Sequence, residues 1–110
     1  MGFKVEMTAE FEAQLGDAVE YRIEHHGLKN ARMLIDSVAH AQSLLERMPF
    51  MGAPLSQGDQ APADDTLRWI RAGAHIIAYR AFENAETITL MKIFHPSSDW
   101  KKRISHEQQR

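Results

Sequence analysis

Three runs rich in β-branched and aromatic residues, all in the C-terminal half, most constrain what this chain can fold into. They occupy residues 67–71, 74–82 and 87–95. Gly73 separates the first two, and the four residues 83–86 separate the last two. Connections this short join antiparallel neighbours, because a parallel crossover needs a dozen or more residues. The pattern therefore predicts a three-stranded antiparallel meander.

Two helices are predicted ahead of the meander. Residues 3–7 alternate as a short strand, and Thr8 then offers a side-chain oxygen to cap a helix. Gly27 divides the helical segment, and Pro49 ends it. Apolar residues recur at helical spacing on both sides of Gly27: Phe11, Leu15, Ala18, Val19 and Ile23 in the first helix; Leu28, Ala31, Leu34, Ile35, Val38, Ala41, Leu45 and Met48 in the second. A connection centred on one glycine favours an antiparallel hairpin.

The predicted element order is β-α-α-β-β-β, an α+β fold with the helix hairpin packed on one face of a mostly antiparallel sheet. The direction in which the first strand pairs stays open. One domain spanning residues 1–110 is expected from the length. A rigid turn at residues 49–54 is expected to place Phe50 and Met51 under the sheet edge, followed by an exposed, mobile loop at residues 56–65.

Composition removes several classes of function. The chain has no cysteine, which excludes disulfides, thiolate metal sites and a cysteine nucleophile. Its six histidines show no metal-binding spacing, so neither a metal nor another cofactor is expected. No apolar run approaches the roughly 20 residues that span a bilayer, and the N-terminus lacks a signal-like apolar region. We expect a cytoplasmic protein with no membrane partner.

Charge is unevenly divided along the chain. Residues 1–66 hold five Lys and Arg against eleven Asp and Glu, whereas residues 67–110 hold eight against four. The overall pI of about 6.3 gives weak support to nucleic-acid binding, which usually requires a strongly basic face. The basic C-terminal part keeps an anionic partner possible, and solvated charges without a partner are an equally good interpretation.

The meander carries the candidate catalytic side chains. Period-two alternation predicts that His75 and Tyr79 share one face of their strand, and that Met91, Ile93 and His95 share one face of the next. A histidine base with arginines to stabilise charge is adequate for cleaving RNA through its 2′-OH. The candidate set for such a nuclease is His75, Tyr79, His95, Arg68, Arg71 and Arg80. The favoured alternative is that the histidine and tyrosine are half-buried sheet residues with satisfied polar atoms.

A short cationic segment follows the last predicted strand. Trp100, Lys101, Lys102 and Arg103 combine an aromatic ring with three positive charges. This combination can bind nucleic acid or an acidic protein surface, and these residues are the candidate target-binding site. In the alternative interpretation, Trp100 caps the sheet core and the cations are solvated.

Taken together, the motifs and their order resemble the RelE/ParE superfamily. The resemblance covers roughly residues 3 to 103 and depends on order and spacing, since no single motif is specific. The motifs are Leu45-x-x-Met48-Pro49-x-x-Gly52-x-Pro54, then Gly73-x-His75-Ile76-Ile77-x-Tyr79, and finally Ile93-Phe94-His95-x-x-x-Asp99-Trp100.

The resemblance implies the toxin of a bacterial type II toxin–antitoxin module, a cytoplasmic growth inhibitor neutralised by a cognate antitoxin. In that family the antitoxin lies over the helix hairpin and sheet, by helix-in-groove or strand-addition binding. Antitoxin contacts are accordingly expected at Phe11, Leu15, Phe50, Met51 and Arg80. ParE-like members of the superfamily poison DNA gyrase, whereas RelE-like members cut mRNA on the ribosome.

Departures from the ribonuclease pattern favour the gyrase-directed interpretation. The pI is mildly acidic, and Pro96, Ser97 and Ser98 stand where relatives often carry arginine. His75 likewise stands where ribosome-dependent cutters often have arginine. Fewer cations mean weaker docking on RNA. A ribosome-dependent mRNA endoribonuclease remains the alternative, and an inactive protein that only binds antitoxin is a third possibility.

Overall fold

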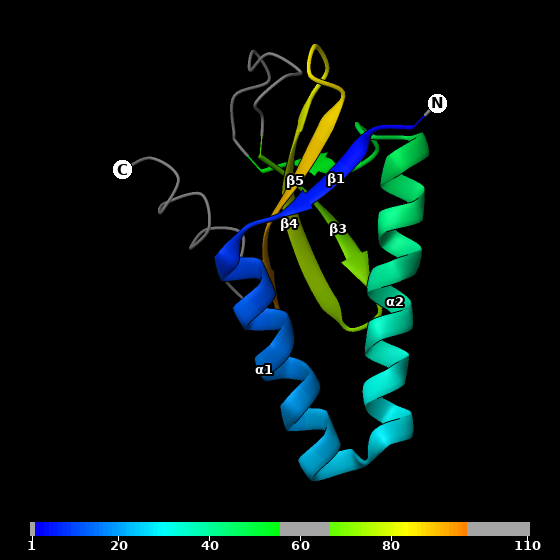
Figure 1. Cartoon of the computed structure of the whole chain (residues 1–110), viewed down its shortest axis with the longest axis vertical. Coiled ribbons are helices and arrows are strands. Elements are labelled where there is room, and N and C mark those ends of the chain that lie inside the picture. Colours follow the sequence, from blue (N-terminus) through cyan, green and yellow to red (C-terminus); the bar gives the residue numbers. More distant parts are fainter. Residues whose placement is uncertain (1, 56–66, 97–110) are drawn as a thin grey trace.

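The computed structural model describes residues 2–55 and 67–96. The elements are β1 (Lys4–Met7), α1 (Ala9–His26), α2 (Leu28–Arg47), β2 (Ala53–Pro54), β3 (Leu67–Ala72), β4 (His75–Phe82) and β5 (Thr87–Phe94). The strands form one sheet in the order β1-β5-β4-β3-β2, and the α1–α2 hairpin covers one of its faces (Figure 1). The predicted α+β fold is confirmed. The loop expected at residues 56–65 and the cationic segment 100–103 lie outside the described residues.

The pairing in the sheet gives the direction of the first strand, which the sequence left open. β1 runs parallel to β5, with Val5 opposite Ile88, while β5, β4, β3 and β2 pair antiparallel in turn. The two-residue β2 falls within the segment interpreted from sequence as a turn, where Ala53 pairs with Trp69. The outermost described strands are therefore short, with four and two residues.

The helix hairpin begins and turns as its sequence predicts. The Thr8 hydroxyl accepts a hydrogen bond of 3.0 Å from the Phe11 backbone N–H, capping α1. Gly27 lies between α1 and α2 and has a φ of 90°, a backbone conformation that residues other than glycine rarely adopt. Neither described helix carries an apolar stretch long enough to cross a lipid bilayer.

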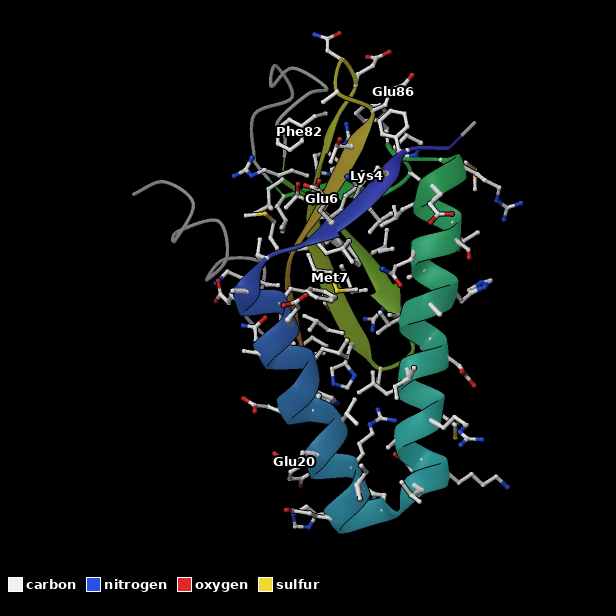
Figure 2. All side chains as sticks on the ribbon, in the orientation of Figure 1. Lys4, Glu6, Met7, Glu20, Phe82 and Glu86 are labelled. Atoms are coloured by element: carbon white, nitrogen blue, oxygen red, sulfur yellow. The ribbon has the colours of Figure 1, made fainter. Side chains whose placement is uncertain are left out.

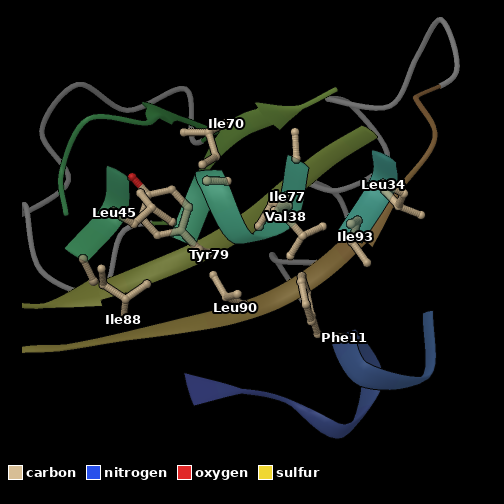
Figure 3. Packing of buried hydrophobic residues seen from close by; sticks show 13 residues of the cluster. Phe11, Leu34, Val38, Leu45, Ile70, Ile77, Tyr79, Ile88, Leu90 and Ile93 are labelled. Atoms are coloured by element: carbon tan, nitrogen blue, oxygen red, sulfur yellow. The ribbon is translucent and has the colours of Figure 1, made fainter. Parts of the chain in front are cut away.

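The main core lies between the hairpin and the sheet (Figure 3). Its buried members are Phe11, Leu34, Val38, Ala41, Leu45, Ile70, Ala72, Ile77, Tyr79, Ala81, Ile88, Leu90 and Ile93. Three residues of the predicted second stripe are exposed instead of buried: Leu28, Ile35 and Met48 are 72%, 48% and 48% exposed. The apolar stripe of α2 is thus wider than the surface that the sheet covers. A smaller cluster of Leu55, Leu67 and Ala78 lies apart from this core.

A β-bulge on β5 changes which side chains share a face. Tyr79 pairs with Leu90 and Ala78 with Lys92, so Met91 is an extra residue in the ladder. Ile93 consequently joins Leu90 in the main core, while Met91 packs against the smaller cluster. The prediction that Met91 and Ile93 share a face was wrong, because one inserted residue reverses the alternation beyond it.

α1 takes over as the neighbour of β5 where β1 stops. The Thr8 backbone N–H donates to the Leu90 carbonyl at 3.0 Å, and the Thr8 hydroxyl donates to the Met91 carbonyl at 3.0 Å. The Ile93 N–H donates to the Gln14 side-chain oxygen at 2.9 Å. Lys92 also pairs with Glu10 at 2.9 Å. The Thr8 and Gln14 side chains thus satisfy backbone groups of Met91 and Ile93 that a neighbouring strand would otherwise pair, which explains how the bulge is tolerated.

Candidate functional site

Two of the candidate catalytic residues hold the segment that connects α2 to β2. The Gly52 N–H donates to the Tyr79 hydroxyl at 2.8 Å, in a buried hydrogen bond. Arg68 Nη1 donates to the carbonyls of Gly52 at 2.8 Å and Phe50 at 3.3 Å. The guanidinium carbon also lies 5.4 Å from the centroid of the Phe50 ring. We call this set of Phe50, Gly52, Arg68 and Tyr79 the Gly52 junction.

The electrostatics of Tyr79 fit this structural role. Burial raises the pKa of its phenol, and the Gly52 hydrogen bond and the Arg68 charge only partly oppose that shift. The hydroxyl therefore stays protonated at neutral pH and is a poor general base. Its side chain has no exposed surface, so a substrate does not reach it in this conformation.

Arg71 and Arg80, the other two candidate arginines, are not part of the Gly52 junction. Arg71 is exposed and pairs with Ile76, whereas Arg68 pairs with Tyr79 and lies on the opposite side of β3 by alternation. Arg80 follows Tyr79 directly, so it also faces away from the main core. The six nuclease candidates are thus divided between the two faces of the sheet, and only part of the set comes together.

His75 and His95 do come together. The bulge places them at neighbouring ends of β4 and β5, with ring centroids 5.5 Å apart and ring planes at 86°. His75 is 7% exposed, and its Nδ1 is buried without a hydrogen-bond partner. Burial lowers the pKa of His75, and the nearby charges of Arg22 and His95 lower it further. His75 is therefore neutral at physiological pH.

We expect the stability of the wild-type protein to fall more steeply on acidification than that of a His75→Gln variant. The folded protein holds the pKa of His75 below its ordinary value of 6.5, so the unfolded chain binds a proton first as the pH falls. This stabilisation is complete above about pH 6.5 and is lost as the pH falls towards the lowered pKa. Urea unfolding at about pH 8 and about pH 5.5 measures the difference.

The variant itself supplies the control for that measurement. All other histidines are shared by the two proteins, so their contributions cancel in the comparison. Equal loss of unfolding free energy in both proteins over this pH range would show that His75 does not titrate abnormally.

The two histidines open onto a cavity of about 560 Å³ between the hairpin and the sheet. We call it the histidine pocket, and its lining residues are Ala18, Tyr21, Arg22, His26, Asn30, His75 and His95. Within residues 2–55 and 67–96, no cluster of three or more His, Asp or Glu side chains is arranged to hold a metal ion. The pocket was not foreseen from sequence, because Arg22 and Asn30 carry no motif and only the fold brings them to the histidines.

A second concavity runs along the outer surface of the hairpin. Its volume is about 820 Å³, and most of its exposed lining is apolar. Leu15, Val19 and Ile23 of α1 face Ile35 of α2 across it, and acidic residues of α1 border it: Glu12, Asp17 and Glu20. Figure 2 shows Glu20 projecting from the outer side of α1. We call this surface the hairpin groove.

The residues expected to contact an antitoxin differ in their accessibility. Phe11 is completely buried in the main core, so the structure does not support a contact role for it; its ring fills the space between α1 and the sheet. Leu15 lines the hairpin groove. Phe50 packs edge-on against Phe3 with centroids 6.3 Å apart, and Met51 is exposed. Arg80 is half-buried on the other face.

Comparison with known proteins gives a consistent result. The model of a family described as the ParE toxin of the type II toxin–antitoxin system parDE matches residues 5–100. No curated protein sequence gave a match. Among solved structures, the chain is similar to one in the chromosomal ParDE toxin–antitoxin system from P. aeruginosa. The TM-score is 0.64 at 13% identity, covering 86% of this chain and 97% of that one.

Two further solved structures share the fold. A chain of the RelBE2 toxin–antitoxin complex from Mycobacterium tuberculosis has a TM-score of 0.62 at 20% identity, covering 87% of this chain and 100% of that one. A chain of the archaeal RelE–RelB complex from Pyrococcus horikoshii OT3 has a TM-score of 0.57 at 16% identity, covering 89% and 99%. At these identities the similarity shows a common fold.

Proposed function

The chain belongs to the ParE toxin family of type II toxin–antitoxin systems, and from this premise we propose that it arrests growth by inhibiting DNA gyrase. The toxin acts in the bacterial cytoplasm and is neutralised there by a cognate antitoxin. One observation carries the choice of target: Arg68 and Tyr79, which a nuclease would need on an open surface, are engaged in the Gly52 junction.

Two further features support an interaction-based toxin over a nuclease. His75 and His95 face the hairpin side of the sheet, whereas Arg71 and Arg80 face the other side, so the sheet separates these two arginines from the histidines. The overall charge of −2 also disfavours docking on RNA, because phosphate contacts dominate nucleic-acid affinity. Inhibition of gyrase needs a complementary protein surface and no catalytic group.

Purified toxin is expected to abolish DNA supercoiling by gyrase at saturating concentration while leaving translated mRNA uncut. The supercoiling assay uses relaxed plasmid, gyrase and ATP, and equimolar antitoxin from the neighbouring gene should restore activity. Unimpaired supercoiling at saturating toxin would reject the proposal.

The same samples distinguish the alternative mechanism. Primer extension on mRNA translated in the presence of toxin would reveal cuts within codons if the protein were a ribosome-dependent endoribonuclease. A His95→Gln variant should keep its gyrase inhibition, because the pocket that His95 lines lies on the hairpin side of the sheet and inhibition uses no general base. Absence of growth arrest on expression without antitoxin would instead indicate an inactive antitoxin-binding protein.

We further propose that the hairpin groove is where the antitoxin binds. The groove exposes Ile23 and Ile35 to solvent and leaves Val19 half-buried, on a toxin surface with no described element covering it. Apolar side chains bordered by Glu12 and Glu20 suit an amphipathic helix whose flanks carry Lys or Arg. The neighbouring structures are themselves toxin–antitoxin complexes, which supports a partner of this kind.

A further inference from the structure

The histidine pocket has a composition that the proposed toxin activity does not explain. It lies where the distal part of the hairpin, which extends beyond the β3–β4 turn in Figure 1, meets the ends of β4 and β5. α1 contributes Arg22 and His26, α2 contributes Asn30, and the sheet contributes His75 and His95. None of the described lining residues is acidic. A concave site with only cationic, titratable and neutral side chains attracts an anion.

Arg22 is fixed in place and keeps donors available. Its Nη1 donates to the Asn30 side-chain oxygen at 3.1 Å and to the Asn30 carbonyl at 3.3 Å, so one amino group ties the guanidinium across the hairpin. A guanidinium has five N–H donors, and the bonds to Asn30 use only those of Nη1. The remaining donors have the planar arrangement that binds carboxylate or phosphate oxygens.

His75 supplies a second, independent indication of a ligand. It is more than nine-tenths buried, lines the pocket and has an unpartnered ring nitrogen at Nδ1. A buried polar group without a partner is costly, and a bound ion or water is one way in which such a group is satisfied. His95 is exposed, and its ring centroid lies 5.5 Å from that of His75.

We propose that the histidine pocket binds a compact oxyanion, the carboxylate or phosphate group of a small molecule, between Arg22 and the His75–His95 pair. The cavity of about 560 Å³ exceeds the size of a bare ion and falls within the range of small-ligand sites. Tyr21 and Ala18 provide an apolar wall for the rest of such a molecule.

Binding should strengthen as the pH falls. The lining has no carboxylate. Its basic groups are Arg22 and His26 from α1, His75 at the start of β4 and His95 just after β5, and its other polar groups are the Tyr21 phenol of α1 and the neutral Asn30 amide of α2. Without a ligand, burial and Arg22 keep the pKa of His75 low. A bound anion opposes both effects, because an opposite charge nearby favours the protonated imidazole. Proton uptake and anion binding are therefore linked.

Sulfate and acetate are the probes for the test, because neither changes its charge between about pH 6 and about pH 8, where histidine does. Isolated toxin is titrated with each anion at constant ionic strength, and histidine and amide NMR signals are followed. We expect saturable shifts centred on His75, His95 and Arg22, with binding at least about tenfold tighter at the lower pH. Preference for sulfate would indicate a phosphate ligand, and preference for acetate a carboxylate.

Matched variants make the result specific. Arg22→Gln should weaken binding by about tenfold or more, whereas Arg32→Gln, an exposed arginine of the same hairpin outside the pocket, should leave it unchanged. His95→Gln tests the site at an exposed residue where folding is not at risk, and should reduce the pH dependence. Shifts that do not saturate, or that persist unchanged in Arg22→Gln, would overturn the proposal. No gyrase or antitoxin enters the measurement, so its failure leaves the proposed function untouched.

Discussion

Gly52→Ala is expected to reduce the free energy of unfolding by about 2–4 kcal/mol, a large share of the roughly 5–15 kcal/mol available to a domain. A Cβ at this position would lie 2.6 Å from the Tyr79 hydroxyl oxygen, 2.7 Å from Tyr79 Cε1 and 2.7 Å from the Trp69 carbonyl. Tyr79 is completely buried in the core, and the Trp69 carbonyl is backbone within β3. The clash would also displace the Gly52 N–H from the Tyr79 hydroxyl, so the cost of the lost hydrogen bond adds to the cost of the steric overlap. Urea unfolding measures the loss.

Gly16→Ala is the matched control. Gly16 lies within α1, and a Cβ there would meet nothing within 4 Å. The same chemical change should therefore stabilise the protein by about 0.5–1 kcal/mol, through helix propensity. Opposite signs for the two substitutions would locate the effect in the junction and not in glycine replacement as such.

The junction also makes a prediction about coupling, which a double-mutant cycle measures. Tyr79→Phe alone should cost about 1–3 kcal/mol, because it leaves the buried Gly52 N–H without an acceptor. In the Gly52→Ala background that hydrogen bond is already lost. Tyr79→Phe also removes the hydroxyl that would lie 2.6 Å from the new Cβ, so this second substitution should cost less than it does in the wild type. Strict additivity would mean that the two residues do not interact as the structure shows.

The sequence predicted the fold because its local signals agree with one another. β-branched runs, the Thr8 cap, the Gly27 turn and Pro49 all favour the same element order, and the structure has the elements there. What the sequence did not predict was the bulge at Met91. Around it, β5 bonds to Thr8, the cap of α1, and to Gln14 of α1, both more than seventy residues away. Alternation within a strand carries no record of such contacts.

The candidate site was predicted less well, for a related reason. Residue types identified His75, Tyr79 and Arg68 as chemically capable, but their roles depend on what they touch. Tyr79 meets Gly52, which the sequence showed only as a turn glycine 27 residues away. His95 reaches His75 because the bulge reverses its face, and the hairpin brings Arg22 to the pocket that both histidines line. Contacts between distant segments, and not residue types, separate a structural tyrosine from a catalytic one.

The apolar residues of the hairpin divide into a buried set and an exposed set. The apolar stripes of the two helices are wider than the sheet can cover, so the inner positions form the core and the outer ones line the hairpin groove. Substitutions at Leu34 or Leu45 would therefore act on folding. If the hairpin groove binds the antitoxin as proposed, substitutions at Ile23 or Ile35 would act on that binding instead. This separation makes binding testable without unfolding the toxin.

Ile23→Gln is expected to weaken antitoxin binding by about 10- to 100-fold with little change in toxin stability. The side chain is 41% exposed in the groove, so the free protein loses little packing when it becomes polar. In the complex, an amide would be buried against an apolar helix face in place of the isoleucine, at a cost of about 1.5–3 kcal/mol. Glutamine is neutral, like isoleucine, so the charge of the groove is unchanged. It also has a favourable helix propensity, so neither electrostatics nor helix propensity accounts for the expected loss of binding. Calorimetry with the antitoxin encoded beside the toxin gene measures the dissociation constant.

Met33→Gln provides the comparison that makes this loss interpretable. Met33 is also an exposed apolar residue of the hairpin, at 57%, but it lies outside the groove. If the antitoxin helix occupies the groove, Met33→Gln should leave the dissociation constant within about twofold of the wild type, since surface substitutions elsewhere usually change free energies by less than 0.5 kcal/mol. Equal losses in both variants would mean that the antitoxin covers the outer hairpin broadly. No loss in Ile23→Gln would place the antitoxin on another surface of the toxin.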